Sequence, residues 1–326
     1  MKKVLIAILL LGLLPHASAD YIHWVDFRLS APVLRSALEL DMASQGGEQP
    51  LDWIDILALA AVWRGGTGVT VADTQRAAQA LRGDTPPERL SGMAGRFFSY
   101  YRAAYGAALG GLVGHFAIRR TDPQTGEAEW IPAYGLKAFS PIAAGYPWSH
   151  YPDFGAQRSY GYARPHLGND ILGALGTPIC AVEGGTVEAL GWNRYGGWRI
   201  GIRSDDRKRY YYYAHLRKDT PYAEGLAVGQ RVQAGNVIGF MGRTGYSAQE
   251  NVNNIETVHL HFGLQLIFDE SQKECDSEIW IDVYPIIELL ASHCSSVARD
   301  PQTGRWERLY PYCDLDAEPL RSAAAR

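Results

Sequence analysis

Four histidines and one aspartate in the second half of the chain have the types and spacing that metal-dependent hydrolysis needs. His166 and Asp170 are four residues apart, and His259 and His261 alternate within an apolar, strand-like run. Side chains two residues apart on a strand point to the same face, about 7 Å from one another. His215 follows a tyrosine-rich run. Together these residues can supply one carboxylate and several imidazoles to one site.

A catalytic zinc ion usually keeps three protein ligands and one open position. The metal lowers the pKa of its bound water toward neutrality, and the water becomes the nucleophile. Spare imidazoles can then accept a proton or stabilise the oxyanion. A single histidine on a strand is more often an ordinary core or surface residue, so the hypothesis depends on the combination. The chain has no His-Glu-x-x-His sequence, which excludes the common helical zinc-protease design.

The region before these residues is patterned as helices. Apolar spacing predicts helices over residues 31–44, 52–64 and 70–82, with a fourth after Pro86-Pro87. Ser30 is a candidate N-cap, and Thr70 with Asp73 three residues later resembles a capping box. We therefore expect a small helical domain over residues 20–114.

The candidate site lies in a region of short strands. β-branched and aromatic runs separated by glycine-rich breaks predict an antiparallel all-β domain over residues 160–270. Before it, residues 115–159 are read as a hairpin and a linker, with the turn at residues 122–126. After it, residues 271–326 are read as a C-terminal helix and hairpin extension. The predicted fold class is α+β.

The N-terminus is typical of an exported protein. Two lysines precede a wholly apolar run over residues 4–14, and Ala17-Ser18-Ala19 fits a cleavage site, so we read residues 1–19 as a signal peptide. Its removal takes two lysines and no acids, which changes the net charge from -4 to -6. We expect a secreted protein, in a periplasm or in the extracellular cell wall, with no membrane span once the signal is removed. The charge balance argues against nucleic acid as a partner.

Export permits disulfides, and the chain has four cysteines. Cys180 lies in an apolar, strand-like run and is expected to be a buried thiol. One bridge is plausible among Cys275, Cys294 and Cys313. None of the four has the close paired spacing of a structural zinc site.

The sequence resembles the lysostaphin-type, LytM-like metalloendopeptidases over about residues 160–266. Four motifs in the family's order carry the resemblance, namely His166-x-x-x-Asp170, Tyr213-Ala-His215-Leu216, Gly235-x-x-Ile-Gly239-x-x-Gly242-x-Thr-Gly245 and His259-Leu-His-Phe262. The resemblance implies a compact antiparallel domain of the duplicated hybrid motif type, with a groove. It also implies a peptidase that cleaves peptide bonds in bacterial peptidoglycan.

The family's site residues carry over by motif. The resemblance implies one Zn²⁺ held by His166, Asp170 and His261, with His215 and His259 as the catalytic histidines. A tyrosine upstream of the first ligand often supports the transition state in this family, and Tyr160 and Tyr162 are the candidates here.

The sequence departs from the family pattern at two places that bear on substrate preference, and two other functions stay open. The loop over residues 247–257 is longer than in most relatives, and Gly263 replaces a commonly acidic residue.

Instead of a peptidoglycan hydrolase, the chain could be an extracellular zinc peptidase acting on Gly-rich protein. It could also be an inactive cell-wall binding or activator module, although degenerate relatives usually lack a ligand and this sequence keeps all three.

Overall fold

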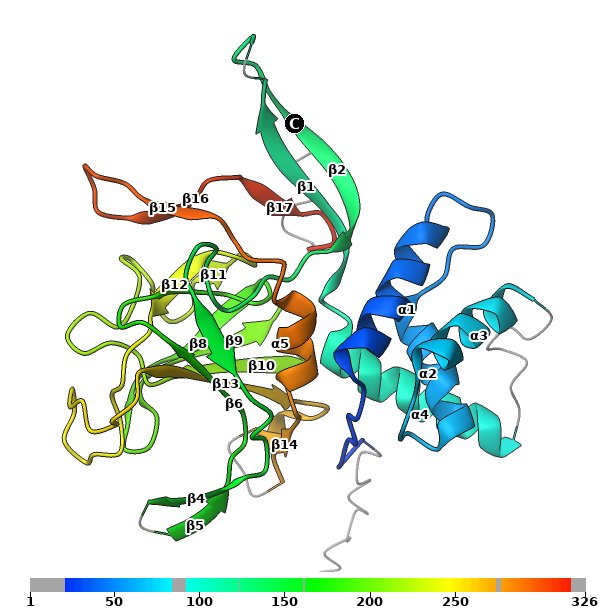
Figure 1. Ribbon diagram of the computed structural model, residues 1–326, viewed down its shortest axis with the longest axis horizontal. Helices are drawn as coiled ribbons and strands as arrows, with labels where there is room; N and C mark the ends of the chain where they lie inside the picture. Colours follow the sequence, from blue (N-terminus) through cyan, green and yellow to red (C-terminus); the bar gives the residue numbers. More distant parts are fainter. Residues whose placement is uncertain (1–20, 84–91, 123, 161, 274–276, 318–326) are drawn as a thin grey trace, which may run out of the picture.

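The structure, a computed structural model, describes residues 21–317 apart from residues 84–91, 123, 161 and 274–276. The predicted signal peptide over residues 1–19 lies outside the described residues, as do Pro86-Pro87 and Cys275. Four helices form the first region, α1 (Ala31–Ser44), α2 (Trp53–Arg64), α3 (Val71–Arg82) and α4 (Gly92–Leu109). They pack together on one side of the molecule, apart from the strands (Figure 1). The described part of the chain contains no helix with the length and apolar character of a membrane span.

Local capping explains where the helices begin. The Asp52 side chain accepts a hydrogen bond from the backbone N–H of Ile54 at the start of α2. Thr70 and Asp73 form the predicted capping box of α3. Ser30 is the N-cap residue of α1 but makes no capping hydrogen bond with its side chain. A proline in the first turn, with φ already set for a helix, favours that start instead.

A mainly antiparallel β region follows. Its central sheet has the strand order β11-β8-β9-β10-β13-β6-β3, and β14 pairs with β13. The bounds are β3 (Trp148–His150), β6 (Asn169–Gly173), β8 (Gly185–Asn193), β9 (Gly197–Ser204), β10 (Arg209–Ala214), β11 (Arg231–Val232), β13 (His259–Leu266) and β14 (Ile279–Trp280). Smaller pairs are β7 (Pro178–Cys180) with β12 (Val237–Phe240), and β4 (Gln157–Tyr160) with β5 (Tyr162–Pro165). The α+β fold class is confirmed.

The segments on either side of the predicted peptidase region contribute to other sheets. The expected hairpin is β1 (Val113–Thr121) with β2 (Ala128–Leu136), which projects from the body (Figure 1) and is joined by β17 (Tyr312–Asp314). The tail contains α5 (Tyr284–Leu290) and the hairpin β15 (Val297–Arg299) with β16 (Trp306–Arg308). Strand β3 lies where the sequence indicated a linker. It was not predicted, because three residues are too few to give a clear alternation of apolar and polar side chains.

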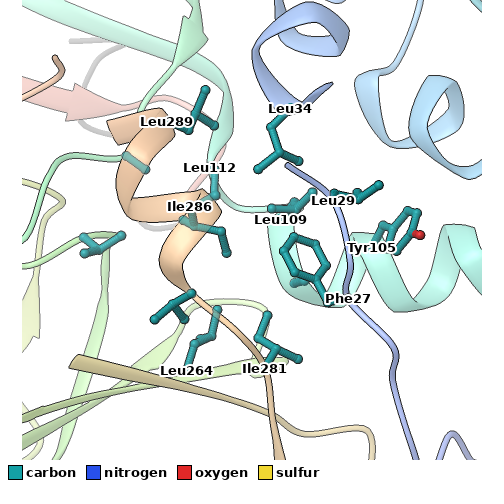
Figure 2. Close-up of a cluster of buried hydrophobic side chains, with 14 of the residues drawn as sticks. Phe27, Leu29, Leu34, Tyr105, Leu109, Leu112, Leu264, Ile281, Ile286 and Leu289 are labelled. Atoms are coloured by element: carbon teal, nitrogen blue, oxygen red, sulfur yellow. The ribbon is translucent and has the colours of Figure 1, made fainter. Parts of the chain in front are cut away.

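One continuous hydrophobic core joins the helices to the sheet. Leu109 and Leu112, at and after the end of α4, face Ile286 and Leu289 of α5, and Leu264 of β13 lies beneath them (Figure 2). All five side chains are almost fully buried. Full burial of such a side chain contributes about 1.5–3 kcal/mol, so this interface holds the helical region firmly against the β region.

A buried ion pair fixes how the two regions meet. The Arg209 guanidinium donates to both carboxylate oxygens of Glu183, at 2.7 and 3.0 Å, and to the Ala107 carbonyl of α4 at 2.7 Å. The Tyr211 hydroxyl donates to the same carboxylate at 2.6 Å. Removing Arg209 would leave the buried Glu183 carboxylate without this charge partner, which is strongly destabilising.

The described cysteines are free thiols. Cys180 is fully buried, as expected from its apolar run. Cys294 and Cys313 are also free, so the predicted C-terminal bridge does not join these two residues. Cys294 follows α5, whereas Cys313 lies on β17 beside β1, and the fold puts the two cysteines in separate elements.

Candidate metal centre and groove

The central strands sort their side chains by face. On β10, Tyr211 and Tyr213 are almost fully buried in the core, whereas Tyr212 between them lines a groove on the opposite face. On β13, Phe262 is in the core and His261 lines the groove. The alternation follows from the two-residue period of a strand. It places Tyr212 and His261 of the two neighbouring strands on one surface.

His166, Asp170 and His261 form a compact group, with one possible ligand atom each and all three atoms within 4.8 Å of one another. Asp170 on β6 is the direct antiparallel partner of His261 on β13. The Asp170 Oδ1 atom lies 3.0 Å from His166 Nε2 and 3.2 Å from His261 Nδ1. The two imidazole nitrogens are 2.8 Å apart. The fold therefore brings together the three residues that the sequence predicts as metal ligands.

Gly168 allows this approach. A Cβ atom at this position would lie 2.6 Å from a carbon of the His261 imidazole and 2.7 Å from the Phe262 carbonyl oxygen. Both distances are below what real Cβ atoms tolerate. Position 168, between His166 and Asp170, must therefore be glycine so that the His261 imidazole can approach.

Two residues that the sequence did not single out orient this group. The Arg158 guanidinium donates to Asp170 Oδ2 and to Asp153 Oδ2, each at 2.8 Å. His166 Nδ1 lies 3.2 Å from both the carbonyl oxygen and the Oδ2 atom of Asp153, and its Nε2 atom faces Asp170 and His261. Such outer partners fix ligand orientation. No motif indicates them, because they reach the site only through the β4–β5 hairpin and the loop before it.

The electrostatics of the group favour a cation. Burial raises the pKa of Asp170, but hydrogen bonds from His166 and His261 outweigh burial and hold that pKa well below its usual range. Burial lowers the pKa of His261, although Asp170 opposes the change. A charged carboxylate and neutral imidazoles are the forms that bind metals. Two imidazoles and one carboxylate fit zinc, which takes nitrogen and oxygen ligands in catalytic sites.

His215 and His259 lie beside this group, with their ring centroids 4.7 Å apart. His215 Nδ1 donates to the Thr244 carbonyl and His259 Nδ1 to the Thr257 carbonyl, each at 2.9 Å. Each Nε2 atom is therefore the unprotonated one, and His259 Nε2 lies 3.7 Å from Asp170 Oδ1. Burial, followed by the neighbouring imidazoles, lowers the pKa of His215 well below its ordinary value.

The backbone at His215 is held in an uncommon conformation, with φ at +62°. A non-glycine residue in this left-handed region costs of order 1–3 kcal/mol and persists where the surroundings fix it. Here the His215 N–H donates to the Gly196 carbonyl at 2.7 Å. The strain turns the imidazole toward the candidate metal centre at the end of β10.

The groove beside the metal centre has a volume of about 510 Å³. One wall comes from Trp280 on β14, whose ring meets Tyr212 edge-on at 6.1 Å between centroids. A Cβ atom at Gly263 would lie 2.8 Å from the Trp280 ring. The missing acidic side chain at Gly263 therefore makes room for this tryptophan.

The tyrosine candidates lie on the hairpin beside the groove. Tyr160 ends β4 and pairs in backbone register with Tyr162, which begins β5; their side chains lie outside the described part of the structure. A different tyrosine, Tyr246, lines the groove and meets the His215 ring edge-on at 5.9 Å between centroids. The sequence did not indicate it, because it lies just outside the motif that ends at Gly245 and far along the chain from the first ligand.

Comparisons with known proteins give the β region a family. The model of peptidase family M23 matches residues 164–274. The chain is 35% identical over 177 residues to the L-Ala–D-Glu endopeptidase of Bacillus subtilis, covering 51% of this chain and 52% of that protein. It is 38% identical over 98 residues to the glycyl-glycine endopeptidase ALE-1 of Staphylococcus capitis, covering 30% and 24% of the two chains.

A solved structure from Ruminococcus gnavus named for the glycyl-glycine endopeptidase lytM aligns with 82% of this chain and 91% of its own, at 25% identity and a TM-score of 0.49. The chain spans about half or less of the length of the two curated relatives. The matched segment includes all five candidate histidine and aspartate side chains. Residues 164–274 of this chain are therefore a peptidase family M23 domain, which confirms the LytM-like resemblance that the sequence motifs indicated.

Proposed function

We propose that this chain is a zinc-dependent endopeptidase that hydrolyses peptide bonds in bacterial peptidoglycan. The observation that carries the proposal is the convergence of His166, Asp170 and His261 within 4.8 Å beside a groove. These three residues would hold one Zn²⁺. When bound there, zinc would lower the pKa of a water molecule and polarise the substrate carbonyl.

The chain's own residues then move the proton. His259 Nε2 is free to accept a proton from the attacking water, because its Nδ1 hydrogen is engaged by the Thr257 carbonyl. His215 Nε2 is free in the same way and can donate a hydrogen bond to the developing oxyanion once protonated. Tyr160 or Tyr162, on the hairpin that borders the groove, would give further support to the transition state.

The name of a Vibrio cholerae relative, the peptidoglycan DD-endopeptidase ShyC, supports peptidoglycan as the substrate. The Bacillus subtilis relative is named for the L-Ala–D-Glu bond and the Staphylococcus capitis relative for the glycyl-glycine bond. We accordingly place the protein outside the cytoplasm, in a periplasm or cell wall, after removal of residues 1–19. N-terminal sequencing of the mature protein tests the export step, and a start at Asp20 is the expected result.

Digestion of purified peptidoglycan tests the activity. The zinc-loaded protein should release fragments with new peptide ends, detected by mass spectrometry, and a chelator should abolish their release. Added zinc should restore it. The new ends would also identify which bond is cut.

The same digestion separates the other two candidate functions. An inactive binding or activator module would sediment with peptidoglycan but leave its fragments unchanged at every zinc concentration. A peptidase of Gly-rich protein would leave peptidoglycan intact and cleave a glycine-rich polypeptide supplied in parallel. Either pattern would contradict the proposal.

A further inference from the structure

Two arginines in the groove stand without an acidic partner. Arg164 on β5 and Arg199 on β9 both line it. No ion pair joins either guanidinium to a carboxylate among the residues that the structure describes. Within the same described set, the Nε atom of each arginine is buried and has no hydrogen-bond partner. A buried unpaired donor is unfavourable and calls for an explanation.

The other charged groups of the groove are already engaged. Arg158 is bonded to Asp170, and Lys273 is paired with Glu188 outside the groove lining. Glu278, the groove's second carboxylate, accepts a hydrogen bond from the Trp280 indole at 2.8 Å. The unneutralised charge of the described groove is therefore positive.

Aromatic rings hold the Arg164 guanidinium in place. The Arg164 guanidinium lies over the Tyr195 ring, 4.8 Å from its centroid, and donates to the Tyr246 hydroxyl at 3.3 Å. Arg199 and Arg164 line the same groove as Tyr212. Burial raises the pKa of the Tyr212 hydroxyl, and the hydrogen bond from Asn193 and the positive charges of the two arginines act against that rise. Held in this way, a guanidinium loses little freedom when it binds an anion.

We infer that Arg164 and Arg199 form a carboxylate-binding subsite, and that the preferred substrates are peptides with a free carboxylate near the scissile bond. The inference rests on the proposed function and specifies its substrate class. A planar guanidinium matches a carboxylate with two parallel hydrogen bonds. Neither arginine belongs to the candidate metal centre or to the catalytic pair, so the two act in substrate selection.

Three synthetic peptides test this subsite and the source of the carboxylate. The first is acetyl-L-Ala-D-Glu-L-Lys amide, the second is its D-Gln counterpart, and the third is the D-Gln peptide with a free C-terminal carboxylate. Their dissociation constants for the zinc-loaded protein are measured by calorimetry on forms whose Ala–Glu or Ala–Gln amide is N-methylated. Hydrolysis of the unmethylated forms is followed separately.

A charge-assisted hydrogen bond predicts about 10- to 100-fold tighter binding of a carboxylate peptide than of the all-amide peptide. Preference for the first peptide identifies a side-chain carboxylate, and preference for the third identifies a terminal one. Arg199→Gln should bring the preference close to one by weakening the binding of the carboxylate peptides. Arg199→Lys should keep part of it, and Arg164→Gln should reduce it.

Arg119→Gln is the matched control, because Arg119 is exposed on the projecting hairpin, lies outside the groove lining and loses the same charge. It should retain the full preference. Equal binding of all three peptides by the wild-type protein, or an undiminished preference in Arg199→Gln, would overturn the inference. Zinc-loaded protein that binds carboxylate peptides selectively but leaves whole peptidoglycan uncut would instead count against the proposed function alone.

Discussion

The two faces of the central sheet differ sharply although the same strands build both. The core face carries Phe262, Tyr211 and Tyr213, which are at most 1% exposed and make ring contacts with one another. The groove face carries His261 and Tyr212 at alternate positions of the same two strands. One face therefore supplies stability, while the other gathers buried ionisable groups that disfavour folding unless they are paired.

The comparison shows how a fold accommodates a reactive site. Charged and strained groups on the groove face, such as His215 with its positive φ, are tolerated because the opposite face is well packed. The core also extends into the helical region through Leu109 and Leu112 (Figure 2). Substitutions on the two faces should consequently affect different measurements.

The largest effect is expected for Asp170→Ala, which removes the only carboxylate of the proposed ligand set. Zinc content, measured by elemental mass spectrometry, should fall from one ion per chain to near zero, and peptidoglycan hydrolysis should be lost. Asp205→Ala removes a surface ion pair and should keep both, since such pairs contribute about 0–1 kcal/mol. A full zinc content in Asp170→Ala would show that the ligand assignment is wrong.

His259→Ala should separate catalysis from metal binding on the groove face. Loss of a general base typically reduces turnover by about 10²–10⁴-fold, while zinc content should stay unchanged. The rate of fragment release and the metal content are measured on the same preparation. His115→Ala, an exposed residue on the projecting hairpin, serves as the control. Near-full activity of His259→Ala would refute the role given to this imidazole.

Phe262→Ala, on the core face, should lower the free energy of unfolding rather than act directly on metal binding or catalysis. Truncation of a fully buried phenylalanine costs about 3–5 kcal/mol, measured as the free energy of unfolding in urea. On the groove face, Tyr212→Phe removes only a hydroxyl that accepts one hydrogen bond from Asn193, and should cost about 0.5–1.5 kcal/mol. Equal losses for the two variants would contradict the division of roles between the faces.

Arg158→Gln should produce the smallest effect of the four. The substitution removes the charged donor to the outer oxygen of Asp170 without removing a ligand. Loss of such an orienting partner weakens metal affinity by about 10–100-fold, measured by competition with a zinc chelator. Arg194→Gln controls for the loss of one positive charge. An unchanged zinc affinity would mean that Arg158 does not orient the site.

Local patterns in the sequence predicted much of the fold. The helix starts at residues 30, 52 and 70 and the hairpin around residues 122–126 depend on neighbouring residues, so short-range rules suffice. Strand β3 was missed because its place depends on pairing with β6, a tertiary contact. The sequence also did not choose a pair among Cys275, Cys294 and Cys313, because the distance between elements cannot be read from residue type. The fold excludes a bridge between Cys294 and Cys313.

By itself, the sequence determined which side chains could share a face, because alternation along a strand is a local property. The resemblance of its motifs to a known family, rather than the alternation, singled out His166, Asp170 and His261, whose roles remain proposals. Only the tertiary structure brought Arg158, the Trp280 wall and the unpaired arginines to the same groove. Those residues arrive from a hairpin, a C-terminal strand and an adjacent strand, and their approach depends on strand order and on the glycines that leave room for them.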